Sequence, residues 1–143
     1  EAGADGIYYA ALGGESYLFT DEEFETYIKP HDLKVLKAAE DSPYNVLHIC
    51  KDRLNLERYR NYPCAVVNWG VYEQNPSLLE GAAIFPDKAI LGGLDDRSGE
   101  QIQNEVNQIL RMMDGRRFLL GADCTLPTEI AYDRIHAAVE AVE

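Results

Sequence analysis

The sequence predicts an α/β protein with a parallel sheet, and two patterns in its 143 residues lead to that prediction. Five short apolar runs recur along the chain, and several end at glycine, which is typical of strands that are buried on both faces. Segments with helical start signals lie between these runs, and strand–helix–strand repeats build parallel sheets through right-handed crossovers. We therefore expect about five β-α units in a single domain that spans residues 1–143.

The five expected strands share a short stretch that is rich in aliphatic and aromatic residues. They cover residues 7–12, 45–50, 64–69, 89–94 and 117–121. Gly13 and Gly14 end the first stretch and Gly70 ends the third, as expected where a buried strand turns toward a helix.

Helical start and stop signals lie between the strands. Thr20 and Glu23 form a capping box ahead of a helix that Pro30 breaks or restarts. A second capping box at residues 98–101 begins a helix that runs to Met113, and Gly115 is placed to end it. Further helices are expected at residues 54–59, at 77–83, and after Pro127 up to residue 142.

The charge of the chain limits its partners. It carries 25 acidic and 13 basic side chains, which give a formal charge of −12. Nucleic acids and anionic membranes require a basic surface, so we expect neither as a partner, whereas a small-molecule substrate in a locally positive pocket is compatible with this charge. No apolar run approaches the roughly 20 residues that cross a bilayer.

The cysteine content and the first residues indicate where the protein works. The chain has three cysteines, an odd number, and they sit inside apolar runs. We therefore expect no disulfide framework, and we expect the protein to work in a reducing cytoplasm. Residues 1–20 lack the basic start and cleavage-like end of a signal peptide. The chain begins at Glu1 without a Met, and a strand-like run follows at once, so we expect it to be part of a longer protein.

Two architectures fit this order of elements: an open doubly wound sheet, or part of a (β/α)₈ barrel. A complete barrel takes about 250 residues for eight units, and five units in this chain match that pace without closing the barrel. Neither a GxGxxG turn nor a GxxxxGK[ST] loop follows any expected strand, so a nucleotide-binding sheet gains no support.

The pair His48 and Cys50 is the sharpest candidate for a functional site. Residues two apart on a strand point to the same face, and Cys124 stands at the corresponding end of a later strand. One imidazole nitrogen and two sulfurs supply three corners of a tetrahedral zinc site whose fourth position is open to substrate. The alternative is that the thiols are ordinary buried cysteines. Cys64 lies at the start of its strand, so we expect it in the core.

Other chemistry-bearing residues follow the strands at the end where parallel α/β proteins bind their ligands. Three of these residues also have a structural alternative: exposure in a polar loop for Glu15, core packing for Trp69, and helix capping for Asp95. Arg97 has the guanidinium that holds a carboxylate. Glu15 is also the only visible candidate for a fourth metal ligand. The candidate substrate-binding residues are Glu15, Asn68, Trp69, Asp95 and Arg97.

Seven short motifs follow one another in a fixed order along nearly the whole chain: Gly3-Ala4-Asp5-Gly6, Phe24-Glu25, Ile28-Lys29-Pro30, Leu47-His48-Ile49-Cys50, Val67-Asn68-Trp69, Gly92-Gly93-Leu94-Asp95 and Leu120-Gly121-Ala122-Asp123-Cys124-Thr125-Leu126-Pro127. This ordered set resembles the C-terminal part of the uroporphyrinogen decarboxylase family. The resemblance implies a (β/α)₈ barrel whose earlier strands are missing from this chain, so that the N-terminal half of the barrel is an expected partner.

Two branches of that family imply two activities. The corrinoid-dependent methyltransferases place zinc on a His-x-Cys pair and a later Cys before a Pro, which His48, Cys50 and Cys124 match. The metal activates a thiol that takes a methyl group from a corrinoid protein. The decarboxylases convert uroporphyrinogen III to coproporphyrinogen without metal or cofactor, and their central N-terminal carboxylate is absent here. Lys51 replaces the usual Gly after His-x-Cys, which alters the turn or faces an anionic substrate.

Three hypotheses follow from the sequence. The first is a zinc-dependent enzyme that transfers a methyl group from a corrinoid protein to a thiol. The second is a metal-free uroporphyrinogen decarboxylase of tetrapyrrole biosynthesis. The third is that the piece alone is an inactive half-barrel, whose unpaired strand edges drive it to form a homo-oligomer.

Overall fold

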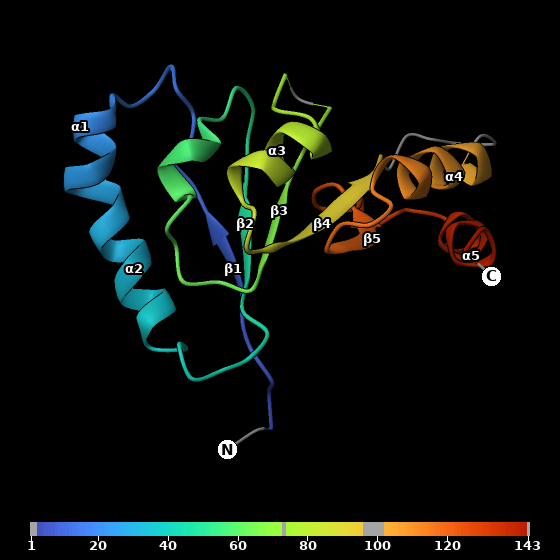
Figure 1. Ribbon diagram of the computed structural model, residues 1–143, viewed down its shortest axis with the longest axis horizontal. Helices are drawn as coiled ribbons and strands as arrows, with labels where there is room; N and C mark the ends of the chain where they lie inside the picture. The colour runs from blue at the N-terminus through green and yellow to red at the C-terminus, as the bar shows by residue number, and fades with distance from the viewer. Residues whose placement is uncertain (1–2, 73, 96–101, 143) are drawn as a thin grey trace.

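A single sheet of five parallel strands forms the centre of the structure, a computed structural model that describes residues 3–72, 74–95 and 102–142 (Figure 1). The strands lie in the order β1-β2-β3-β4-β5. Their bounds are β1 Tyr8–Ala11, β2 Val46–Ile49, β3 Val66–Trp69, β4 Ala89–Leu94 and β5 Phe118–Ala122. All five strands were predicted, and each begins and ends within three residues of the expected position.

The strand order decides between the two expected architectures. A doubly wound sheet reverses its order at a switch point, whereas here every strand follows its predecessor in one direction. That order is the one found in (β/α)₈ barrels. Among the described residues β1 and β5 each pair with one strand only, so the sheet is an open part of a barrel. The predicted incomplete barrel is confirmed, and the doubly wound alternative is wrong.

Helical segments connect the strands. They are α1 Asp21–Glu23, the π-helical turn η1 Phe24–Ile28, α2 Lys29–Lys37, the 3₁₀ turn η2 Leu56–Tyr59, α3 Leu78–Ile84, α4 Ile102–Met112 and α5 Tyr132–Glu140. The capping box predicted at residues 98–101 lies outside the described residues. Gly115 has a φ of 74° after α4, as expected for a residue that ends a helix. No helix in the described parts of the chain is long and apolar enough to span a membrane.

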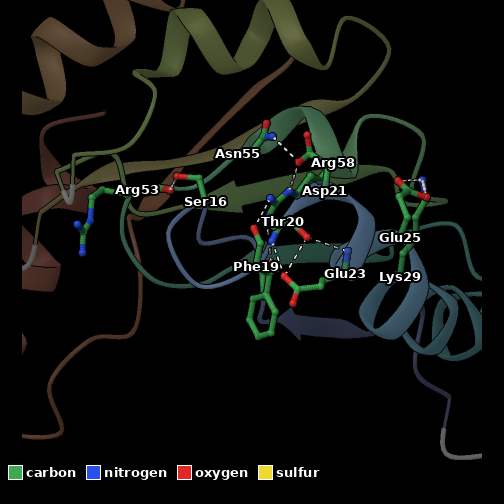
Figure 2. Close-up of polar contacts among 11 residues, drawn as sticks. Ser16, Phe19, Thr20, Asp21, Glu23, Glu25, Lys29, Arg53, Asn55 and Arg58 are labelled. Carbon is green, nitrogen blue, oxygen red and sulfur yellow. Dashed lines mark hydrogen bonds and ion pairs between the residues drawn. The ribbon is translucent and has the colours of Figure 1, made fainter.

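The first helical segment shows why Pro30 restarts a helix. The Thr20 side chain accepts a hydrogen bond from the backbone of Glu23, and the Glu23 carboxylate accepts one from Thr20 N, 2.8 Å away (Figure 2). Pro30 lacks an N–H group, and the preceding turn widens so that Lys29 N–H donates to Phe24 O. α2 then begins with Pro30 in its first turn, where no backbone N–H is needed.

The core lies between the helices and one face of the sheet. Side chains alternate along a strand, so Leu47, Ile49, Val67 and Trp69 all point toward the helices and are buried. Trp69 packs so closely against α3 that a Cβ atom at Gly81 would collide with its six-membered ring. The opposite face, which we call the inner face, carries the residues of one register row: Ala10, His48, Asn68, Leu91 and Leu119.

Two buried polar side chains, Arg58 and Asp32, join the elements of the helical layer around β1. The Arg58 guanidinium of η2 donates to Asp21 Oδ1 at 2.9 Å and to Phe19 O at 2.7 Å, so it joins η2 to the loop before α1 (Figure 2). Asp32 of α2 accepts from Tyr9 OH at 2.6 Å and from Tyr62 OH at 2.9 Å. Arg58 and Asp32 are themselves buried, and each is paired with polar groups from distant parts of the chain, as buried polar groups generally are.

Candidate metal centre

The structure brings His48, Cys50 and Cys124 together at the carboxyl end of the sheet. His48 is the third residue of β2 and Cys50 follows its last residue, so alternation places both on the inner face. Cys124 stands two positions after the end of β5. The open barrel curves between β2 and β5, which carries the third side chain to the first two.

The spacing of the three donors fits a zinc ion. One ligand atom from each residue lies within 4.8 Å of the other two, and His48 Nε2 is 3.5 Å from Cys124 Sγ. Tetrahedral bonds of about 2.3 Å to sulfur and about 2.0–2.1 Å to nitrogen would separate such atoms by roughly 3.6 Å. Imidazole and thiolate are the ligands that zinc prefers, and three of them leave one position for a substrate atom.

Asn68 of β3 contacts His48 from the neighbouring strand. Its side chain is fully buried, and its Oδ1 atom lies at hydrogen-bonding distance from His48 Nδ1. The amide nitrogen of Asn68 donates to Leu91 O at 2.8 Å and reaches Ala122 O at 3.2 Å. Asn68 therefore joins the histidine to β4 and to the end of β5, two positions before Cys124.

Tyr8 of β1 stacks on the His48 ring. The two rings stack with centroids 5.8 Å apart, and Tyr8 OH donates to Asn68 Oδ1 at 2.8 Å. The side chain is 58% exposed on the inner face.

Burial favours the neutral forms of these groups. It lowers the pKa of His48, although the hydrogen bond to Asn68 acts in the opposite direction. Burial also raises the pKa of Cys50, and the nearby charge of Cys124 raises it further. The pKa of Tyr8 is raised by burial and then by the two thiols. A neutral imidazole is the form that binds a metal, whereas each thiol must lose its proton to do so.

The structure separates Glu15 and Trp69 from this cluster. Glu15 was expected to be exposed if it had no functional role, but it is only 5% exposed. Its carboxylate accepts from Gly13 N at 2.9 Å, so it stabilises the turn after β1 and is not among the clustered donors of the described residues. Trp69 lies on the helix-facing side, with Nε1 donating to Pro76 O at 2.8 Å. The core packing given as its alternative role is what the structure shows.

The remaining predicted substrate-binding residues differ in position. Asn68 lies beside His48, where its buried amide is fully engaged by protein groups. Asp95 follows β4 and is half-buried at an apolar cavity of about 690 Å³ between β5 and α5. Arg97 lies outside the described residues. Cys64, expected in the core, is partly buried and packs against it.

Sequence reasoning missed the contact that Tyr8 makes. Tyr8 pairs with Val46, and Ala10 pairs with His48, so only the register of β1 against β2 reveals that Tyr8 reaches the histidine. Asp123 precedes Cys124 in the sequence, and its structural role was not predicted. Its Oδ2 atom accepts from Val71 N at 2.8 Å, and burial raises its pKa to about 6. It therefore ties the loop after β3 to the segment that carries Cys124.

The whole chain, residues 1–143, matches the family model described as uroporphyrinogen decarboxylase (URO-D). The chain belongs to the uroporphyrinogen decarboxylase family. The resemblance stated from the sequence motifs is thus confirmed. No curated protein matches the chain closely enough to count as a relative.

A solved structure extends the comparison of the fold. The chain is similar to a methyltransferase from Methanosarcina mazei, with a TM-score of 0.78 and 20% sequence identity. The match covers 98% of this chain and 42% of that protein. The chain therefore spans less than half the length of the methyltransferase, and its fold corresponds to part of a larger barrel.

Proposed function

We propose that this member of the uroporphyrinogen decarboxylase family is the C-terminal part of a zinc-dependent enzyme that transfers a methyl group from a corrinoid protein to a thiol. The proposal is carried by one observation: a nitrogen and two sulfurs lie within 4.8 Å of one another on the inner face. The solved methyltransferase of similar fold supports it, because it links this architecture to the same type of reaction.

In this proposal His48 Nε2 and the sulfurs of Cys50 and Cys124 would hold the metal. Zinc in such a site lowers the pKa of a bound thiol, so that the thiol is present as a nucleophilic thiolate near neutral pH. Tyr8 stacks on the His48 ring close to both thiols and would shield the acceptor from water. The thiol ligands must stay reduced, which is consistent with a cytoplasmic enzyme.

The remaining part of the barrel would supply the rest of the active site. The chain spans 42% of the methyltransferase of similar fold, and the inner face is bordered by two unpaired strand edges among the described residues. We infer that an N-terminal half completes the barrel, encloses the substrate and presents the surface on which a corrinoid protein docks. The 143-residue chain by itself would then be inactive.

Metal analysis of the full-length protein tests the proposal. We expect one zinc ion per chain in the wild type and a large loss of zinc in Cys124→Ala. Cys64→Ala is the matched control, because it removes a thiol that hydrogen-bonds to Tyr62 O and takes no part in the cluster. Substoichiometric zinc in the wild type, or unchanged zinc in Cys124→Ala, would overturn the proposal.

A second candidate is the metal-free decarboxylation of uroporphyrinogen, which is favoured by the description of the family model that matches the chain. In that case His48 and Cys124 would line a substrate pocket without metal. Incubation of the full-length protein with uroporphyrinogen distinguishes the two. Formation of coproporphyrinogen by zinc-free protein would favour decarboxylation, and its absence would remove this candidate.

A further inference from the structure

We propose that Asn68 is a positioning residue that holds His48 in the single ring tautomer whose Nε2 atom can bind a metal ion. That this tautomer serves to bind zinc rests on the proposed function. The position of the ring proton itself is a property of the metal-free protein and can be measured without zinc. Three features of the structure lead to this inference: the orientation of the Asn68 amide, the donors around its oxygen, and the position of the second ring nitrogen of His48.

The orientation of the Asn68 amide is fixed by its surroundings. The Nδ2 atom faces three backbone carbonyl oxygens, those of Leu91 at 2.8 Å, Ala122 at 3.2 Å and Asp123 at 3.3 Å. Carbonyl oxygens only accept hydrogen bonds, so exchanging the amide oxygen and nitrogen would set one oxygen against three others. Such a buried contact without donors would be strongly unfavourable. The nitrogen therefore points toward β4 and β5, and the oxygen toward β2.

The oxygen in turn sets the proton on His48. Oδ1 is an acceptor only, so the Nδ1 atom that contacts it must carry a proton and donate. Tyr8 OH donates to the same oxygen at 2.8 Å, which uses its second lone pair and holds it in place. A neutral imidazole carries one ring proton, and a proton on Nδ1 leaves Nε2 with a free lone pair. That lone pair faces Cys124 Sγ, 3.5 Å away.

The same amide also sets the spacing of the donors. Two of its three carbonyl partners, Ala122 and Asp123, immediately precede Cys124. One buried side chain thus links the histidine directly to the backbone that positions the second sulfur. Hydrogen bonds of this kind to a ligating histidine typically change metal affinity 10–100-fold when removed.

Nitrogen NMR of histidine tests the tautomer in the wild-type protein without metal. Full-length protein labelled with ¹⁵N-histidine is prepared metal-free, and the His48 signals are assigned from their loss in His48→Gln. We expect the pattern of a neutral ring with the proton on Nδ1. A predominant Nε2–H form would overturn the inference, even if the protein binds zinc. Conversely, failure to bind zinc would end the proposed function and leave the tautomer result intact.

Zinc competition with a chelator provides a second test. Asn68→Leu removes the acceptor at similar volume, and we expect it to weaken zinc binding by about 10–100-fold. Asn45→Leu is the matched control, since Asn45 is also buried and bonds to Ile7 N and Ala39 O at the opposite end of β2. It should keep the wild-type affinity. Equal losses in both variants, or no loss in Asn68→Leu, would contradict a positioning role. If Asn68→Leu does not fold, the NMR measurement decides.

Discussion

The Nε2 atom of His48 lies 3.5 Å from the Sγ atom of Cys124, although 76 positions separate the two residues in the chain. They come from the second and fifth β-α units, and three strand pairings connect the strands that carry them. The distance is set by the curvature of the sheet and by the Asn68 amide that links both ends. The candidate metal centre is thus a product of the tertiary fold.

The tyrosines around Asp32 should make the protein sensitive to alkali. Burial and the hydrogen bond to Asp32 raise the pKa of Tyr9 to about 12, and burial beside Asp32 raises the pKa of Tyr62 even more. A raised tyrosine pKa means that the folded state keeps its protons while the unfolded state loses them. The contribution of these tyrosines to the free energy of unfolding should therefore be constant below pH 10 and fall as the pH rises from 10 through 12.

Denaturant unfolding at a series of pH values measures this decline. Tyr62→Phe removes one of the titrating groups, so it should lower the free energy of unfolding by about 1 kcal/mol at neutral pH and make the decline above pH 10 shallower. Parallel curves for the wild type and the variant would show that Tyr62 does not contribute to the alkaline sensitivity.

Gly81→Ala should destabilise the protein although alanine favours helices. The new Cβ atom would meet the six-membered ring of Trp69, and overpacking of this kind costs about 1–3 kcal/mol. The gain in helix propensity is at most about 1 kcal/mol, so a net loss is expected. Thermal or urea unfolding measures it.

The same substitution in a Trp69→Phe variant tests whether the indole ring causes this loss of stability. Trp69→Phe deletes the ring atoms that a Cβ at position 81 would meet, so Gly81→Ala should cost less there than in the wild type. The same cost in both backgrounds would mean that the indole is not the obstacle.

Lys51→Gly should stabilise the turn after β2. Lys51 has a φ of 88°, a conformation that is strained for any residue with a Cβ atom and is free for glycine. The backbone oxygen of Lys51 accepts from Asn75 Nδ2 at 2.9 Å, which holds the turn in place whatever the side chain. Compared with Lys51→Ala, we expect Lys51→Gly to be more stable by about 1 kcal/mol. Equal stability of the two variants would show that the backbone relaxes when the side chain is shortened.

The 143-residue chain expressed alone should self-associate. Tyr8 and Leu119 on the inner face are 58% and 50% exposed, and the outer edges of β1 and β5 carry no strand among the described residues. Exposed apolar faces and free strand edges pair with other chains. Light scattering should detect a dimer or larger species, and Leu119→Lys should shift it toward monomer. A monodisperse wild-type monomer would contradict this expectation.

The positions of the strands and the convergence of His48, Cys50 and Cys124 could be predicted from the sequence, because both follow from local rules. Alternation places His48 and Cys50 on one face, and parallel strands bring their carboxyl ends to one edge. The same alternation puts Trp69 on the face opposite to Asn68, so these adjacent residues do not share one site. Core packing was given as the alternative for Trp69, and it agrees with this rule.

Contacts between distant segments were beyond a reading of the sequence. Glu15 is buried because it caps Gly13 N and pairs with Leu54 in an antiparallel bridge, and neither partner can be inferred from a polar loop. Tyr8 reaches the histidine only through the register of β1 on β2. The expectation that Lys51 alters the turn or faces an anionic substrate stays a prediction, since its positive φ is the conformation that glycine itself favours.

The order of the strands has a consequence for biosynthesis. Each strand pairs with the strands just before and after it in the chain, so every pairing closes a loop of one β-α unit, which has a modest entropic cost. Assembly can thus proceed step by step as the polypeptide emerges from the ribosome. In the proposed zinc enzyme the last sulfur ligand is made only with the fifth unit, so zinc would bind after the intervening strands have joined. A nascent chain that ends before residue 124 lacks the third ligand and would not retain zinc after its release from the ribosome.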